Sequence, residues 1–285
     1  MTRLAFQSRK YVLGAALIAV LAASGCAKRE KAESLENLPP EVIFKRAEAQ
    51  LTTRKGAKKA AHTFTEVERL YPYSEWAKRS VIMSAFAHHQ AKEYEESRAA
   101  AQRYLDFYPA DEDAAYAQYL MALSFYDQID KVSRDQGVTF QALQALRTTV
   151  ERYPDSEYAT SALLKFDLTL DHLAGKEMDI GRYYLKLGHF GAAINRFRVV
   201  VEDFQTTTHT PEALHRLVEA YISLGIDEDA QVAGAILGHN FRGTDWYKDS
   251  HVLLTGRGIS TDAVSTKGDG WLKRIWRQAV RGQWL

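Results

Sequence analysis

The fold is decided by residues 181–197, which read GRYYLKLGHFGAAINRF. Tyr184 follows the small residue Gly181 by three positions, and Phe197 follows the small residue Ala193 by four, so each pair lies on one face of a helix. A small residue lets two helices approach closely, and a large apolar residue one turn later fills the space beside the contact. The stretch therefore predicts two antiparallel helices in close contact.

Equivalent positions recur along the chain. Tyr-Pro dipeptides close three amphipathic segments, at residues 71–72, 108–109 and 153–154. The small residues are Ala60, Ser97, Ala142, Ala193 and Ala230, which lie 37, 45, 51 and 37 positions apart. Helix pairs with these features at a period of about 34 residues are typical of tetratricopeptide repeats. We therefore expect an all-α, tetratricopeptide-like solenoid of about five helix pairs, wound as a right-handed superhelix.

The spacing of the small residues is uneven, and two segments account for the residues in excess of the usual period of about 34. We expect a polar loop over residues 127–137 and a lengthened first helix of the fourth repeat over about 156–187. Ser74 and Ser156 follow Tyr-Pro dipeptides at positions suited to N-caps, and Thr210 precedes a proline suited to a first turn. Each of these signals favours the start of a helix.

The first 25 residues indicate export. Three basic residues and no acid in segment 2–10 precede an apolar run over 11–23, which is typical of a secretory signal peptide. The run is shorter than the ~18 to 20 residues that a permanent membrane helix needs. We expect residues 1–25 to be removed as a lipoprotein signal peptide.

The signal ends at the only cysteine of the chain. Residues 21–26 read LAASGC, which resembles a bacterial lipobox, in which the Cys26 thiol takes up diacylglycerol. Acyl chains on Cys26 would hold the protein at a membrane. Ala27, rather than Asp, follows the cysteine, which favours the outer membrane. We expect residues 26–38 to form a lipidated tether; the alternative is that Cys26 is a buried free cysteine.

Composition excludes several classes of protein. The 285 residues are 46% hydrophobic and carry a net charge of +1, which argues against nucleic-acid binding through bulk positive charge. One cysteine excludes intramolecular disulfides and zinc sites of the CxxC type. The nine histidines show no HExxH spacing, and neither a GxSxG elbow nor a P-loop is present. We expect no catalytic residue, no metal and no cofactor other than the lipid on Cys26.

The end of the chain carries a basic amphipathic segment. Residues 271–281 read WLKRIWRQAVR, and a helix would place Leu272, Ile275, Trp276 and Ala279 on one face and most basic side chains on the other. Such a helix can lie on an anionic membrane surface or dock on a partner. It can equally fold back as a cap on the solenoid. We assign residues 248–285 to a C-terminal tail and leave both alternatives open.

Five motifs distinguish this chain from a generic tetratricopeptide solenoid. After the lipobox come YPYSEWA at 71–77, RYPDS at 152–156, GKEM at 175–178, GRYY at 181–184 and AAINRF at 192–197. Together they closely resemble the BamD family of outer membrane lipoproteins in its alphaproteobacterial form, over residues 39–247. The resemblance implies a non-enzymatic, lipid-anchored component of the β-barrel assembly (BAM) complex on the periplasmic face of the outer membrane, which helps to insert barrel proteins.

The resemblance also implies a partner-binding site. In the family, the C-terminal repeats hold a POTRA domain of the barrel protein BamA, and the matching residues here are Tyr183, Tyr184, Asn195 and Arg196. Arg196 is the first choice for a charged contact, because a guanidinium suits a carboxylate on a partner. The alternative is an ion pair within the chain, with Glu202 or with a neighbouring repeat.

The N-terminal repeats of the family are implicated in receiving the C-terminal segment of unfolded barrel precursors. The aromatic residues that could meet such a segment here are Phe44, Tyr73, Trp76 and Tyr94. Other BAM lipoproteins are further partners that the resemblance implies, and no nucleic acid is expected.

Two other functions compete with this interpretation. One is a tetratricopeptide adaptor lipoprotein for peptidoglycan or envelope enzymes, which would share the anchor and the solenoid. The other is an envelope enzyme with a helical domain, such as a lytic transglycosylase. The helical repeats occupy nearly the whole exported chain, which leaves no room for a catalytic domain.

Overall fold

The computed structural model describes residues 34–52, 54–132, 134–260, 264 and 270–284. The expected signal peptide and Cys26 lie outside these residues. Within them every regular element is a helix and none is a strand, so the all-α prediction is confirmed.

A short 3-10 helix, η1, is followed by twelve α-helices in the described part of the chain. Their bounds are η1 Leu35–Asn37, α2 Pro40–Gln50, α3 Arg54–Leu70, α4 Glu75–Ala91, α5 Tyr94–Phe107, α6 Ala114–Tyr126, α7 Gly137–Arg152, α8 Glu157–Lys186, α9 Phe190–Asp203, α10 Thr210–Leu224, α11 Asp227–Asn240, α12 Asp245–Gly256 and α13 Trp271–Val280.

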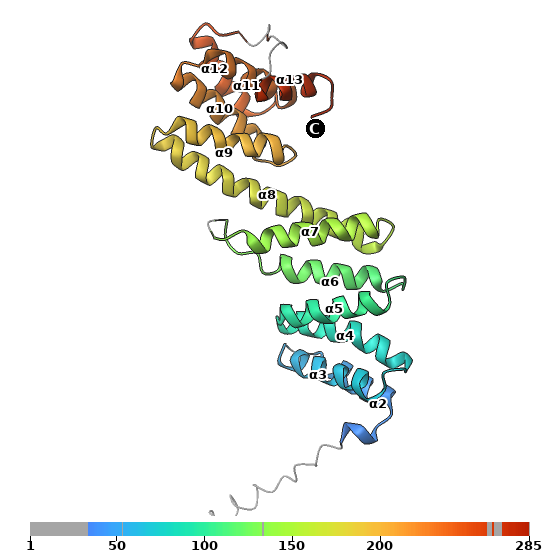
Figure 1. Ribbon diagram of the computed structural model, residues 1–285. Helices are drawn as coiled ribbons and strands as arrows, with labels where there is room; N and C mark the ends of the chain where they lie inside the picture. The colour runs from blue at the N-terminus through green and yellow to red at the C-terminus, as the bar shows by residue number, and fades with distance from the viewer. Residues whose placement is uncertain (1–33, 53, 133, 261–263, 265–269, 285) are drawn as a thin grey trace, which may run out of the picture.

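The helices form a stack of consecutive pairs. Each helix from α2 to α11 packs against the next one along the chain, and Figure 1 shows them piled along one axis, from α2 at one end to α12 at the other. The pairs α2–α3, α4–α5, α6–α7, α8–α9 and α10–α11 are the five repeats that the spacing of small residues predicts. The tetratricopeptide-like architecture is confirmed.

The predicted small residues lie where helices touch. The side chains of Ala60, Ser97, Ala142, Ala193 and Ala230 are all completely buried. They stand on α3, α5, α7, α9 and α11, the second helix of each pair. Close approach of two helix backbones needs a small side chain at the contact, and this requirement produces the repeating pattern.

The uneven spacing also has the expected origin. Helix α8 begins after Ser156 and ends before Leu187, which are the limits that the sequence indicates. Helix α6 ends at Tyr126 and α7 begins at Gly137, so the polar stretch between them is a connection. With 30 residues, α8 is long enough to pack against α7 at one end and α9 at the other.

Only one of the three predicted caps has the expected geometry. Ser74 Oγ accepts a hydrogen bond from the N–H of Ala77 at 3.1 Å, as an N-cap does. Ser156 occupies the N-cap position of α8, but its hydroxyl donates to the carbonyl of Tyr153 instead. Thr210 is the first residue of α10, so the cap position falls one residue earlier than predicted, at His209.

The C-terminal segment folds back on the solenoid. Helix α12 packs on α10 and α11, and it spans the position at which the expected solenoid ends, between residues 247 and 248. Helix α13 packs on α11 and buries Leu272, Ile275 and Ala279 in the largest apolar cluster of the structure. Of the two alternatives for the tail, the structure therefore selects the hydrophobic cap.

None of the helices in the described part of the chain combines the length and the apolar character needed to cross a membrane.

Candidate functional site

Arg196 lies on α9 and reaches across to the long helix α8. Its Nη1 donates to Oε2 of Glu177 at 3.1 Å, and 43% of the Arg196 side chain remains exposed. Arg196 therefore forms an ion pair within the chain, and the acceptor is Glu177. Glu202, the acceptor that the sequence suggested, pairs with Arg198 at 2.6 Å and with Arg274 of α13 at 2.9 Å.

The guanidinium of Arg196 retains capacity for a second acceptor. It carries five N–H donors in a planar fork, and the bond to Glu177 uses one of them. Because the side chain is partly exposed, a carboxylate from outside the chain can approach it without displacing Glu177. Arg196 thus joins α9 to α8 and leaves part of its guanidinium exposed.

The two tyrosines of α8 differ in their environment. Tyr183 is 61% exposed, whereas Tyr184 packs against the apolar core, and their rings meet edge to face at 5.8 Å. Tyr184 follows Glu177 by seven residues, which places both on one face of α8. Tyr183 follows Glu177 by six residues and points from another face. The structure thus places Arg196 and Tyr184 along the α8–α9 seam, with Tyr183 outside it and Asn195 exposed on α9.

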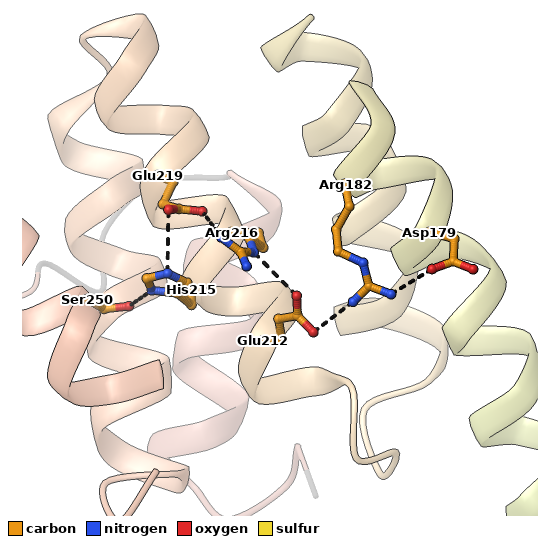
Figure 2. A network of polar contacts seen from close by, with 7 residues as sticks. All are labelled: Asp179, Arg182, Glu212, His215, Arg216, Glu219 and Ser250. Carbon is orange, nitrogen blue, oxygen red and sulfur yellow. Dashed lines mark hydrogen bonds and ion pairs between the residues drawn. The ribbon is translucent and has the colours of Figure 1, made fainter. Parts of the chain in front are cut away.

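A polar network joins α8, α10 and α12 beside this region (Figure 2). Arg182 of α8 donates to Glu212 of α10 at 2.8 Å and to Asp179 at 2.7 Å. Glu212 also accepts from Arg216 at 3.3 Å, and Arg216 donates to Glu219 at 2.7 Å. The bond between Arg182 and Glu212 connects the fourth repeat to the fifth, and the other bonds hold its two partners in place within α8 and α10.

The network ends in a buried pair between α10 and α12. Nδ1 of His215 lies 2.8 Å from Oγ of Ser250, and Figure 2 shows the imidazole between Ser250 and Glu219. Burial raises the pKa of Glu219, but hydrogen bonds from His215 and Arg216 outweigh it, and the pKa is lowered overall. Glu219 is therefore ionised at neutral pH. Sequence reasoning missed this network, because its members are dispersed over 72 positions.

A groove of about 760 Å³ opens between α7, α8 and α9. Glu177 lines it, so the groove adjoins the ion pair of Arg196. Its apolar lining includes Leu143, Leu173 and Phe204. The volume lies within the range of about 300–1,000 Å³ that ligand pockets occupy. We refer to it as the α7–α9 groove.

The four aromatic residues expected to meet barrel precursors do not form one surface. Phe44 is only 2% exposed and packs against Phe64 and Trp76, with ring centroids 5.1 Å apart in each case. Tyr73 is fully exposed in the turn before α4. Tyr94 contacts the ring of His89 at 5.5 Å. Phe44 and Trp76 are thus in contact, and the ring of Phe44 is part of the hydrophobic core.

The described residues contain no group of three or more histidine, cysteine or acidic side chains arranged to hold a metal ion.

Comparison with known proteins decides the family. Residues 36–235 match the family described as YfiO, outer membrane lipoprotein. The chain belongs to this family. It is 47% identical over 256 residues to the outer membrane protein assembly factor BamD of Caulobacter vibrioides, covering 89% of this chain and 84% of that protein.

More distant relatives carry the same name. The chain is 37% identical to BamD of Rickettsia prowazekii over 243 residues, which are 85% of this chain and 96% of that protein. It is 28% identical to BamD of Neisseria meningitidis serogroup A over 78% of this chain and 88% of that protein. The resemblance to the alphaproteobacterial BamD family is confirmed, and the protein is an outer membrane lipoprotein by family. The names describe an assembly factor, in agreement with a protein that is not an enzyme.

Proposed function

We propose that this chain is a component of the BAM complex that assembles barrel proteins into the outer membrane, as a non-catalytic scaffold. The observation that carries the proposal is the 47% identity to a BamD assembly factor over 89% of the chain. The extended stack of helix pairs supports it, because such solenoids present long binding surfaces.

The anchor in this proposal is a lipid on Cys26, with residues 26–38 as the tether. The helices then stand on the periplasmic face of the outer membrane. Several acyl chains on one cysteine suffice for this, since each buried methylene contributes about 0.8 kcal/mol.

The contact with a POTRA domain of a BamA-like barrel protein is assigned to the fourth repeat. Arg196 offers an acidic residue of that domain the N–H donors that its bond to Glu177 does not use, and exposed Asn195 and Tyr183 lie on the same two helices. Tyr184 supports the seam from inside. A charge-assisted bond of this kind is short and directional, which favours one orientation of the partner.

Barrel precursors are assigned to the N-terminal repeats. Tyr73 is exposed there, and Trp76 and Tyr94 are partly exposed, so each of the three can meet an aromatic side chain of a precursor. Phe44 would act indirectly, by supporting the ring of Trp76. Other BAM lipoproteins are proposed as further partners of the solenoid.

The test is an affinity purification of the tagged, lipidated protein from outer membranes, with mass spectrometry of the proteins that co-purify. The variants are Arg196→Glu and its matched control Arg103→Glu. Arg103 is 42% exposed and pairs with Glu68 at 3.3 Å, so it reproduces the exposure and ion pairing of Arg196 in another repeat.

We expect a POTRA-bearing barrel protein to dominate the wild-type and Arg103→Glu eluates and to be depleted about tenfold or more for Arg196→Glu. Equal recovery with both variants would remove Arg196 from the contact. An eluate of peptidoglycan enzymes without such a barrel protein would favour the adaptor function instead.

A further inference from the structure

The first half of α8 exposes three leucines. Leu163, Leu164 and Leu168 are 49%, 61% and 52% exposed. Single apolar residues on a surface are ordinary, but a group of them marks an interaction site. The group exists because α8 has 30 residues whereas its partner helix α9 has 14, so α9 is too short to cover the whole of α8.

One face of α8 is covered at one end and open at the other. Gly181 follows Leu163 by 18 residues, or five turns of 3.6 residues, so the two lie on the same face. The ring of Phe197 of α9 packs on Gly181. The cover ends near Asp171, which accepts from the N–H and the hydroxyl of Thr208 at 3.0 and 2.6 Å, in the connection between α9 and α10. From there back toward the start of α8 the face is open.

The second repeat shows what covers the equivalent face. Ser74 and Ser156 occupy the N-cap positions of α4 and α8, so residues at equal distances from them correspond. The seventh and eighth residues after the cap are Val81 and Ile82 in α4, and residues 163–164 in α8. Val81 and Ile82 are only 3% and 5% exposed, because they form one cluster with residues of α5 and α6. This face is therefore of a kind that helices cover.

The charge of the open face indicates the chemistry of a helix that covers it. The eleventh residue after the cap is Ala85 in α4, which is completely buried, and Asp167 in α8, which is exposed. Asp167 forms no ion pair with another residue in the part of the chain that the structure describes. Lys165, the only basic residue between 157 and 171, lies over the ring of Tyr126 of α6. Because an unpaired charge is costly to bury, a covering helix needs a basic residue opposite Asp167.

We propose that Leu163, Leu164, Asp167 and Leu168, the uncovered α8 face, bind a basic amphipathic helix of a partner protein. The apolar side chains of that helix lie on the leucines, and a lysine or arginine pairs with Asp167. The bound helix takes the place that a second helix takes in the other repeats. The proposal is independent of the contact assigned to Arg196, which pairs with Glu177 in the other half of α8.

The first test uses a synthetic probe and the full lipidated chain in phosphatidylcholine nanodiscs. The probe is a fluorescent peptide of leucine and lysine at helical spacing, and its control replaces every lysine with glutamate. Fluorescence anisotropy measures the Kd, with empty nanodiscs as the blank.

Two variants change the uncovered α8 face, and each has a matched control. Leu164→Ser is compared with Leu187→Ser, a leucine that is 51% exposed just after the end of α8. Asp167→Lys is compared with Asp106→Lys, at an exposed carboxylate of α5. We expect each change on the face to weaken binding of the lysine peptide about fivefold or more, and each control to change it less than about twofold. All four side chains are exposed, so the variants are expected to fold, which circular dichroism checks.

Several outcomes would overturn the proposal. The lysine peptide could fail to bind beyond the blank, or the glutamate peptide could bind as tightly. Both changes on the face could match their controls, which would place the peptide elsewhere. If Leu164→Ser alone weakens binding, the face takes an apolar segment without a charge pair, and the basic character of the partner is wrong.

A photocrosslinking residue at position 164 of the full chain tests the natural occupant in cells, with position 187 as the control. We expect a product specific to position 164, and mass spectrometry of the crosslinked peptide should show a net positive charge and apolar residues at helical spacing. An acidic peptide, the alternating pattern of a barrel strand, or a peptide from a second copy of this chain would overturn the assigned occupant. The absence of a product specific to position 164 would overturn the site.

Discussion

Gly181 of α8 and Phe197 of α9 lie so close that a Cβ atom on Gly181 would stand 2.4 Å from Cε1 of the phenylalanine ring. Phe197 is completely buried, so its ring has no space into which it can retreat. The glycine at this position is therefore required by the close contact of the two helices that carry the candidate partner site.

Gly181→Ala should consequently destabilise the fourth repeat. We expect a loss of about 1–3 kcal/mol, the usual cost of overpacking a core, measured as a lower midpoint of denaturant unfolding. Gly191→Ala is the control, because nothing lies within 4 Å of a Cβ at that position. Alanine is a better helix former than glycine, so the control should be at least as stable as the parent. Equal midpoints for both variants would contradict the steric argument.

The bond between Arg182 and Glu212 predicts a second effect, on the junction of the fourth and fifth repeats. Glu212→Gln removes the charge that two arginines share, and we expect a loss of about 1–2 kcal/mol, discounted because Arg182 is partly exposed. Glu41→Gln is a matched control, since Glu41 also lies in the first turn of a helix and pairs with a cation four residues on. It should change the thermal midpoint little. Equal losses of stability in the two variants would show that Glu212 acts only within its own helix and not across the junction of the two repeats.

The stability of the fold at acid pH should depend on Asp111. Burial raises the pKa of Asp111, but hydrogen bonds from Lys78 and Tyr104 outweigh it, so the folded-state pKa is lowered. A lowered pKa stabilises the fold above the unfolded value of about 3.9, and this stabilisation is lost as the pH falls through the folded value.

Asp111→Asn should therefore lower the thermal midpoint at pH 7, and the difference from the parent should shrink on acidification below about pH 4. Thermal unfolding at both pH values measures it. Asp106→Asn, at an exposed carboxylate of α5, controls for the substitution itself. A difference that is constant with pH would show that the ionised carboxylate is not the stabilising form.

Much of the fold could be predicted because its determinants are local. A small residue at a helix contact is visible in the sequence, and all five predicted positions are buried. The length of α8 could be predicted because apolar periodicity continues without a break from Ser156 to Leu187. The difference between the two serines could not be predicted. The hydroxyls of Ser74 and Ser156 both donate to the carbonyl three residues earlier, but only Ser74 also accepts from the first turn of its helix.

The site was less predictable because it depends on how helices are juxtaposed. Glu202 is six residues from Arg196 on the same helix, and residues at that separation do not share a face. Glu177 is nineteen positions away, and only the packing of α8 on α9 brings it within 3.1 Å. The α7–α9 groove combines residues from 134 to 204, so no single stretch of sequence contains it.

The docked tail leads to a final prediction. Leu272 of α13 is buried among residues of α11, and Lys273 and Arg274 of the same helix pair with Glu228 and Glu202 of the solenoid. Leu272→Ala should cost about 2–4 kcal/mol and increase hydrogen exchange in α11, because a cavity opens in that cluster. Val280→Ala, at an exposed position of α13, should leave exchange unchanged. If Leu272→Ala also leaves α11 protected, α13 does not stabilise the end of the solenoid, and its basic face becomes available for a membrane or a partner.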